Sequence, residues 1–441
     1  MRILAITAGA GAMYCGSCLR DNALAAELMN KGHDVSLLPV YTPTVTDEPN
    51  VSEERVFFGG VSVYLQQHVP LFRKTPWLLD RIWDSGPVIR ALAGRSVSVD
   101  PKMLGELTVS MLKGEEGFQG KEVEKLLHFL GTQPPYDLVV LPNSLLLGLA
   151  GPIRRRLKCP VGCTLQGEDL FLESLMEPYR SESLALMRRH VPSVDGFFAV
   201  SDYYAGFMAE LLGLPRGRVH TIPLGINLDG RAPDRPRPGE RPFTVGYFAR
   251  VAPEKGLHLL AEAYRLLRAG GGGEARLEVA GYLAREHQGY LAGVRRKMED
   301  WGLAGEFHYR GVLDRAAKVA LFHDVDVLCV PSPYVEPKGL YVLEAMASGV
   351  PAVSPRHGAF PEMIAATGGG LLATPGDPRA FADALRALRD DPARAAELGR
   401  RGAEGVRRHY SADRMAQRAL EVYGALTQQT SVAVAQVGGG R

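Results

Sequence analysis

Two glutamates, Glu336 and Glu344, lie eight residues apart in the stretch EPKGLYVLEAMASGVPAV. An apolar run before them ends in Pro-Ser-Pro, a short loop follows, and a helix is expected to begin near residue 338 and stop at Gly349. The N-terminus of such a helix points free N–H groups at the loop, so an anion fits there. Carboxylates accept hydrogen bonds from pairs of hydroxyl groups. The stretch therefore suits a phosphate with a sugar on each side, which describes a sugar nucleotide.

Two cations, Arg250 and Lys255, occur in the stretch VGYFARVAPEKG. A strand is expected to end at Arg250, a turn follows, and Lys255 comes just before the next helix. Both side chains can therefore point away from the carboxyl end of one strand. Breaking a sugar–diphosphate bond leaves negative charge on the diphosphate, which cations already held in place stabilise. We assign Arg250 and Lys255 to that leaving group, the alternative being two solvated side chains on a loop.

Alternating strands and helices make up most of the chain, which predicts parallel, doubly wound sheets of the α/β class. Strands are expected at residues 2–7, 35–40, 136–141, 160–165 and 196–200, and again at 243–248, 276–280, 307–310, 325–330 and 350–354. Residues 227–239, rich in proline, glycine and charge, separate the two series and indicate a linker. Residues 56–65 alternate like a strand or hairpin, and residues 428–441 are polar and glycine-ended, so they are expected to fray.

The stretch with Glu336 and Glu344 resembles the E-x7-E signature of retaining family 4 glycosyltransferases, which have the GT-B fold: two Rossmann-like, doubly wound parallel-sheet domains with an interdomain cleft. The resemblance covers residues 242–365 most closely, 1–40 and 136–225 less closely, and 44–130 least. It implies an N-terminal acceptor domain at residues 1–225 with an insertion at about 44–130, a nucleotide-sugar-binding domain at 226–411, a helix at 412–427 that crosses back to the first domain, and a flexible tail at 428–441.

The same resemblance implies a role for each matching residue. Glu344 would bind the ribose hydroxyls, and Glu336 would face the reacting side of the donor sugar. The backbone amides of Gly339 and Leu340 would contact the distal phosphate, and the backbone of Val312 would contact the base. The implied catalytic residues are Arg250, Lys255 and Glu336.

Glycines between the first strand and helix form a second candidate phosphate-binding element. Gly9 and Gly11 lie in the loop AGAGAMYCGS, where a backbone without side chains can approach a phosphate or a sugar. A tight connection explains the same glycines. In the resembling family this loop lies near the donor phosphate and the acceptor.

Some residues depart from the family pattern or allow other interpretations. Gln166 follows a strand where the family often has histidine; it can form hydrogen bonds but cannot transfer a proton. Cys15 and Cys18 have the spacing of a redox pair, while a zinc site with Cys159 and Cys163 is disfavoured because those cysteines belong to another part of the sheet. A third interpretation is that these cysteines are small residues that only fill space in the packing.

These observations predict a retaining glycosyltransferase that moves a sugar from a UDP-, GDP- or ADP-linked donor to a hydroxyl of a glycan, a lipid or a small molecule. No metal or further cofactor is required, since cations and a helix terminus replace Mg²⁺. One alternative is a glycogen- or starch-synthase-like enzyme, which residues 60–65 resemble, although the first loop lacks the lysine of those enzymes. Two further alternatives are a sugar-nucleotide epimerase and a regulator that binds a nucleotide sugar without catalysis.

Composition limits which binding partners and which cellular compartment fit this sequence. The net charge of +2 gives no electrostatic case for nucleic acid, and five cysteines in 441 residues do not make a disulfide framework. No apolar run approaches the length of a membrane span, so a cytoplasmic enzyme is expected. Residues 69–83, with two tryptophans and a phenylalanine, suit an acceptor-binding wall, a peripheral membrane contact of the N-terminal domain, or a small satellite core. The oligomeric state, the base, the sugar and the acceptor are not set by these patterns.

Overall fold

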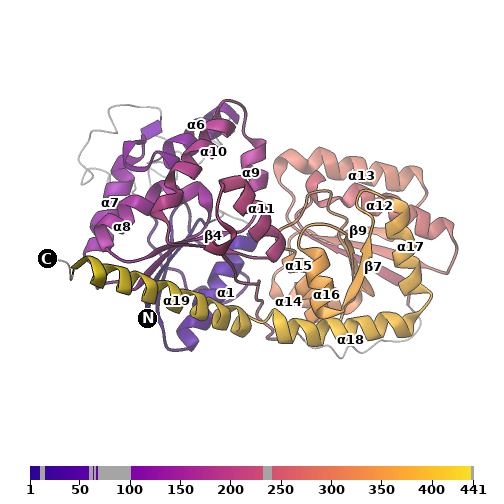
Figure 1. Ribbon diagram of the computed structural model, residues 1–441. Coiled ribbons are helices and arrows are strands. Elements are labelled where there is room, and N and C mark those ends of the chain that lie inside the picture. Colours follow the sequence, from indigo (N-terminus) through magenta and orange to yellow (C-terminus); the bar gives the residue numbers. More distant parts are fainter. Residues whose placement is uncertain (10–14, 59–62, 64–65, 68–100, 232–240, 439–441) are drawn as a thin grey trace. The chain divides into compact units, whose positions relative to one another are not determined.

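The computed structural model describes residues 1–9, 15–58, 63, 66–67, 101–231 and 241–438. The chain divides into two compact units. Unit 1 comprises Met1–Ile222 together with Ala416–Arg441, and unit 2 comprises Pro223–Met415. Each unit contains one six-stranded sheet with helices around it (Figure 1).

The sheet of unit 1 has the strand order β2-β1-β3-β4-β5-β6, and every neighbouring pair is parallel. Its strands are β1 Arg2–Thr7, β2 Asp34–Pro39, β3 Leu138–Leu141, β4 Val161–Leu165, β5 Gly196–Ala199 and β6 Val219–Thr221. β3, β4 and β5 are buried along their whole length, which explains their continuous apolar sequences.

The helices of unit 1 include the C-terminal helix of the chain. They are α1 Gly16–Asn30, α6 Pro101–Leu112, α7 Gly120–Gly131, α8 Ala150–Leu157, α9 Asp169–Ser174, α10 Tyr179–His190, α11 Asp202–Leu212 and the greater part of α19 Ala412–Gly438. α19 (yellow in Figure 1) packs on the sheet through Tyr423, whose ring centroid lies 5.0 Å from that of Phe198 in β5. Short 3-10 segments occupy Gly114–Glu116, Ser144–Leu149, Val191–Ser193 and Arg216–Arg218.

The sheet of unit 2 has the order β12-β11-β10-β7-β8-β9 and is also parallel. Its strands are β7 Phe243–Phe248, β8 Ala275–Ala280, β9 Phe307–Tyr309, β10 Val327–Cys329, β11 Ala352–Pro355 and β12 Gly370–Ala373. β7 lies between β10 and β8, so the strand order reverses beside it. In open α/β sheets, ligands bind beyond the carboxyl ends of the strands at such a reversal.

The helices of unit 2 are α12 Leu257–Ala269, α13 Gln288–Asp300, α14 Arg315–Asp324, α15 Leu340–Ala347, α16 Phe360–Thr367, α17 Pro378–Arg389 and α18 Pro392–His409. Several begin at sequence signals for a helix start. The side chains of Asp314, Asp377 and Asp391 accept hydrogen bonds from backbone amides of the first turns of α14, α17 and α18. 3-10 segments occupy Pro253–Lys255, Arg285–His287 and Ala304–Glu306.

All ten expected strands are confirmed within a few residues, but β6 and β12 were not predicted. Both are short edge strands. The strand expected at residues 56–65 is wrong for the residues described there: 56–58 are irregular and Val63 is helical. The adjoining Gln66 and Gln67 are helical too, and both hydrogen-bond to side chains at the start of α7, whereas neighbouring residues of a strand point to opposite faces.

Part of the segment that is expected to fray is helical, since α19 continues to Gly438. This segment contains no proline, and a helix once started extends at little cost. Residues 69–83 and Gly11 lie outside the described part of the chain. Among the described residues, no helix combines the length and the apolar character needed to cross a membrane.

Candidate active site

The loop after β7 carries Arg250 and Lys255. Arg250 forms an ion pair with Glu254 and keeps 38% of its side chain exposed. Lys255 closes the 3-10 turn Pro253–Lys255 just before α12. Gly256 then adopts a positive φ of 74°, and a Cβ there would lie 2.1 Å from the carbonyl oxygen of Pro331. Only glycine allows this approach, which brings the loop after β7 against the loop after β10.

Hydrogen bonds join these two loops. The carbonyl oxygen of Glu254 accepts from Ser332 Oγ at 2.8 Å and from the amide of Tyr334 at 3.4 Å. Their parent strands, β7 and β10, are neighbours in the sheet. The carboxyl ends of two strands more than 70 residues apart in sequence thus form one local structure.

Lys255 and Glu336 meet at this junction as an ion pair. The Glu336 side chain is 5% exposed and that of Lys255 14%. Burial raises the pKa of Glu336, but the charge and hydrogen bond of Lys255, aided by Lys338, outweigh burial and hold that pKa below its ordinary value. Lys255 Nζ also lies 5.6 Å from the ring centroid of Tyr334 and 5.8 Å from that of Tyr341. The cation therefore has a carboxylate and two aromatic rings around it.

The backbone of Glu336 is fixed from the start of α16. Its carbonyl oxygen accepts a hydrogen bond from the amide of Ala359 at 2.9 Å. Gly358 has a positive φ of 61°, and a Cβ there would be 2.4 Å from that same oxygen. Gly358 and Ala359 thus hold the loop that carries Glu336.

The helix expected after Glu336 is confirmed as α15, with Gly339 at its N-cap in a left-handed conformation, φ 77°. Within the described residues, the amides of Gly339, Leu340 and Tyr341 donate no hydrogen bond. The hydroxyl of Tyr341 is also buried without a partner there. Unused donors at a helix N-terminus next to a lysine form an anion-binding arrangement.

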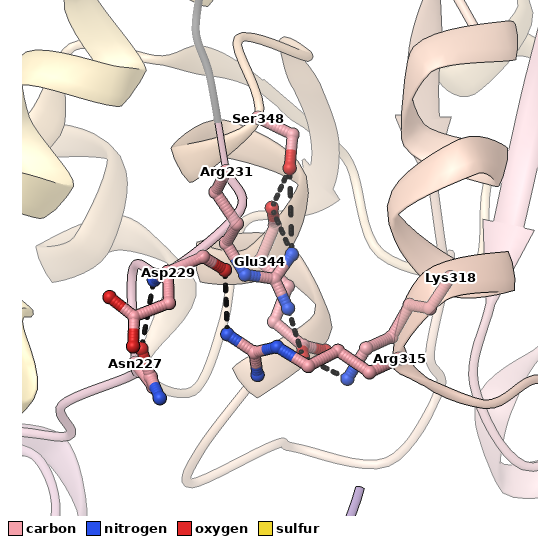
Figure 2. Close-up of polar contacts among 7 residues, drawn as sticks. All are labelled: Asn227, Asp229, Arg231, Arg315, Lys318, Glu344 and Ser348. Atoms are coloured by element: carbon pink, nitrogen blue, oxygen red, sulfur yellow. Dashed lines mark hydrogen bonds and ion pairs between the residues drawn. The ribbon is translucent and has the colours of Figure 1, made fainter. Parts of the chain in front are cut away.

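Glu344 lies further along α15, with 12% of its side chain exposed. Its Oε1 atom is 2.8 Å from Nη2 of Arg231 and 2.5 Å from Nζ of Lys318 (Figure 2). Both contacts use Oε1, so Oε2 is the oxygen that can accept hydroxyl groups. No hydrogen bond or ion pair joins Glu344 to Glu336 or Lys255 among the described residues, so the two glutamates occupy separate positions along one helix and its loop.

Val312 follows β9 and exposes 54% of its side chain. Gly311 before it has a positive φ of 73°, and its carbonyl oxygen accepts a hydrogen bond from Gly281 at 2.8 Å. β8 and β9 therefore end side by side on the same edge of the sheet as β7. The structure places Val312 at this edge, and among the described residues no hydrogen bond joins it to the other predicted site residues.

The predicted residues of unit 1 have structural partners. Gly9 has a positive φ of 76°, and a Cβ there would lie 1.9 Å from the carbonyl oxygen of Thr42, so close packing alone requires glycine. Gln166 is buried and donates from Nε2 to the carbonyl oxygen of Pro142 at 2.8 Å. Glu168 accepts from Ser144 and Tyr204, so it too is engaged within the unit.

The five cysteines are free thiols. Burial raises the pKa of Cys163 and Cys329, and contact with Cys15 together with burial raises that of Cys18. No cluster of three metal-ligating side chains is present in the described ranges. The structure thus places Cys15 beside Cys18 and does not bring them to Cys159 or Cys163.

Sequence reasoning missed the partners of the predicted residues: Arg231 and Lys318 at Glu344, and Tyr334 and Tyr341 at Lys255. Tyr341 stands inside the quoted motif and could have been noticed as a polar group on a buried helix. Nothing in the sequence indicated that Arg231 and Lys318 would be buried, because a cationic side chain in a linker or on a helix is ordinarily exposed to solvent.

Two family models match this chain over most of its length. Residues 231–405 match glycosyl transferases group 1, and residues 21–225 match the glycosyl transferase 4-like domain. Among curated proteins, a phosphatidyl-myo-inositol mannosyltransferase of Mycobacterium leprae is 32% identical over 230 residues, 48% of this chain and 55% of that protein. A glycogen synthase of Mycobacterium tuberculosis is 32% identical over 220 residues, 49% of this chain and 50% of that protein. The chain spans about half the length of these curated relatives.

Solved structures agree on the fold. Anabaena HepE, whose crystal structure is in complex with UDP and glucose, superposes with a TM-score of 0.66 over 96% of this chain and 100% of that one, at 16% sequence identity. At this identity the similarity concerns the fold alone, and it confirms the predicted GT-B class. With both halves of the chain matched by models of one kind and both sheets of the expected type, the protein belongs to the family 4 glycosyltransferases of GT-B fold.

Proposed function

We propose that this protein is a retaining glycosyltransferase that moves a sugar from a nucleoside diphosphate to a hydroxyl acceptor. The observation that carries the proposal is the Lys255–Glu336 pair, which lies between the carboxyl end of β7 and the unused amides of α15. A cation, a carboxylate and a helix N-terminus are the groups that a diphosphate and an attached sugar need.

Each part of the donor has a candidate partner in unit 2. Arg250 and Lys255 hold the diphosphate, and the amides of Gly339 and Leu340 bind its distal phosphate. Glu336 accepts hydroxyls of the transferred sugar, and Glu344 accepts those of the ribose. The backbone at Val312 contacts the base, which the exposure of that residue permits.

Catalysis in this proposal is electrostatic. The bond between the anomeric carbon and the diphosphate oxygen breaks with its electron pair going to that oxygen, where Arg250 and Lys255 stabilise the charge. The acceptor oxygen bonds to the anomeric carbon on the same face, and its proton passes to the departing phosphate oxygen. Because that phosphate oxygen accepts the proton, the mechanism needs no histidine at the position that Gln166 occupies.

The relatives suggest which donors to try first. UDP is bound in HepE, one curated relative is a mannosyltransferase, and another is a glycogen synthase. The first experiment is a thermal-shift screen of UDP, GDP and ADP. Turnover is then measured as release of the preferred nucleotide from its glucose, galactose and mannose conjugates, with polyol, glycan and lipid acceptors.

The anomeric configuration of the product, read by proton NMR, tests retention. Product with the donor's configuration supports the proposal, and inverted product overturns the retaining mechanism. Equal loss of donor with and without every acceptor favours an epimerase or hydrolase. Elongation of glycogen favours the glucan-synthase alternative, and tight nucleotide binding without any turnover favours a regulator. If none of the three nucleotides raises the melting temperature, the site assignment fails.

A further inference from the structure

We propose that Arg231 and Lys318 are positioning residues that fix Glu344 in the orientation needed to bind a ribose. The inference rests on the proposed function, in which Glu344 accepts the ribose hydroxyls. Neither cation belongs to the motifs that identify the family 4 resemblance, and both are almost fully buried, with 1% and 4% of their side chains exposed.

Both cations approach the same oxygen of Glu344 from different elements. Arg231 comes from the segment that follows β6, and Lys318 comes from α14 (Figure 2). Their distances to Oε1 are 2.8 and 2.5 Å. A glutamate on a helix surface ordinarily samples several rotamers, and ordering it when a ligand binds costs free energy. Two fixed cations on Oε1 impose that order in advance and leave Oε2 for the ligand.

Arg231 also holds the backbone of Glu344. Its Nη1 atom lies 3.1 Å from the carbonyl oxygen of Glu344 and 3.5 Å from Oγ of Ser348, which itself donates to that carbonyl. The planar guanidinium therefore contacts the main chain and the side chain of one residue at once, which a lysine ammonium cannot reproduce in full.

The cations themselves are held in place. The carbonyl oxygen of Arg231 accepts from Nη2 of Arg407 at 2.9 Å, and that of Asp229 accepts from Nη2 of Arg315 at 2.8 Å. Arg231 lies 5.9 Å from the ring centroid of Phe322, and Lys318 lies 5.8 Å from that of Phe248. The arrangement is thus built from several elements around one carboxylate.

Fold stability alone does not account for this cluster. Burying ions costs about as much as their attraction returns, and apolar residues of similar size often serve stability as well or better. Nε of Arg231 is buried without a partner in the described residues, which adds a further cost. Two cations against one carboxylate also leave a net positive charge at Glu344, which favours an anionic ligand nearby.

The test compares a nucleoside diphosphate with its 2′-deoxy analogue. Whichever of UDP, GDP and ADP binds best is titrated calorimetrically beside dUDP, dGDP or dADP. The wild type should prefer the ribose form by about tenfold or more, because a hydroxyl bonded to a carboxylate is lost in the analogue. Glu344→Ala should bring this ratio to about one.

Arg231→Leu and Lys318→Leu should each reduce the ratio several-fold while both proteins stay folded, as expected for a buried ion replaced by an apolar side chain. Arg231→Lys should keep most of the ratio, since it returns a cation near Oε1. Arg241→Leu is the matched control. Arg241 pairs with Asp326 and with the carbonyl oxygen of Asp324 in the same unit, so its loss should lower the melting temperature and leave the ratio unchanged.

The outcomes separate this inference from the function on which it rests. If Glu344→Ala abolishes the preference for ribose while Arg231→Leu and Lys318→Leu retain it, the positioning role is overturned and the proposed site stands. If the wild type shows no preference, or Glu344→Ala keeps it, both the role of Glu344 and the inference fail. If only one of Arg231→Leu and Lys318→Leu reduces the preference for ribose, the shared positioning role of the two cations is overturned.

Discussion

The ammonium group of Lys255 forms an ion pair with the carboxylate of Glu336, which lies 81 residues further along the chain. The pair joins the loop after β7 to the loop after β10, and it stands beside the N-terminus of α15. In the unliganded protein the two side chains neutralise each other. A bound diphosphate sugar would offer phosphate oxygens to the lysine and hydroxyl groups to the glutamate.

Lys255→Ala should lower kcat by about 100- to 1000-fold, as the loss of a preorganised donor to a developing anion does. Nucleotide affinity should fall much less, because Arg250 and the α15 amides remain. Steady-state kinetics with the preferred donor give both values. Lys297→Ala removes an exposed lysine that pairs with Glu262 in the same unit and should leave both unchanged. Equal kcat in wild type and Lys255→Ala would remove this lysine from the mechanism.

Glu336→Gln should make the protein less stable at neutral pH, and the difference should shrink in acid. The pKa of Glu336 in the folded protein lies below its ordinary value of 4.5, because Lys255 outweighs the effect of burial. The unfolded chain therefore takes up the proton first, and the stability that Glu336 contributes is lost as pH falls from 4.5 through the lowered pKa.

Urea unfolding of wild type and Glu336→Gln at neutral pH and at several values below pH 5 measures this difference. Glu262→Gln, in an exposed ion pair with Lys297, should differ little from wild type at any pH. If the difference in stability between wild type and Glu336→Gln stays constant through the acid range, it would contradict the lowered pKa of Glu336.

Gly256→Ala should destabilise the protein and reduce turnover together. Gly256 has φ 74°, and its added Cβ would lie 2.1 Å from the carbonyl oxygen of Pro331, so the loop that carries Lys255 must move. Gly302 provides a matched control: its φ is 71°, with nothing within 4 Å of its Cβ position. Gly302→Ala should cost about 1–2 kcal/mol for the backbone conformation alone. Gly256→Ala should cost more in chemical denaturation, and equal costs would argue against the close approach of the two loops.

The meeting of Lys255 and Glu336 was predictable because each follows a strand of a parallel sheet, and the carboxyl ends of such strands share one edge. That prediction rested on the regular alternation of strands and helices in the sequence, which indicates a parallel sheet. The order of the strands did not appear in the sequence: β10 pairs with β7 rather than with β9, and this non-local pairing decides which loops touch.

The pairing of Glu344 with Arg231 could not be predicted. Arg231 stands 113 residues before Glu344, in a glycine- and proline-rich segment that local signals mark only as a linker. Burial of a cation depends on what the other elements bring to it, here α14 and α15. The alternation at residues 56–65 suggested a strand, but Val63 and the adjoining Gln66 and Gln67 are helical. The side chains that hydrogen-bond to Gln66 and Gln67 lie more than 50 residues further along the chain, so local sequence does not reveal them.

Tyr341→Phe should have opposite effects on stability and on donor binding. The Tyr341 hydroxyl is buried and has no hydrogen-bond partner in the part of the chain that the structure describes, so the fold bears the cost of its desolvation. Burial raises the pKa of this phenol well above its ordinary value, so it stays a neutral donor. Removing the hydroxyl should therefore leave the unliganded protein as stable or more stable, by up to about 1 kcal/mol.

The same change should weaken binding of the nucleotide sugar, because the Tyr341 ring centroid lies 5.8 Å from Lys255 Nζ and its hydroxyl, an unused donor among the described residues, can bond to the donor's phosphate or sugar. Tyr264→Phe is the control, since the Tyr264 hydroxyl donates to Glu306 at 2.6 Å. Its loss should cost about 1 kcal/mol of stability and leave donor affinity unchanged. Unfolding midpoints and calorimetric affinities of the two variants decide the matter. A Tyr341→Phe protein that is less stable and binds donor normally would show that this hydroxyl serves the fold rather than the ligand.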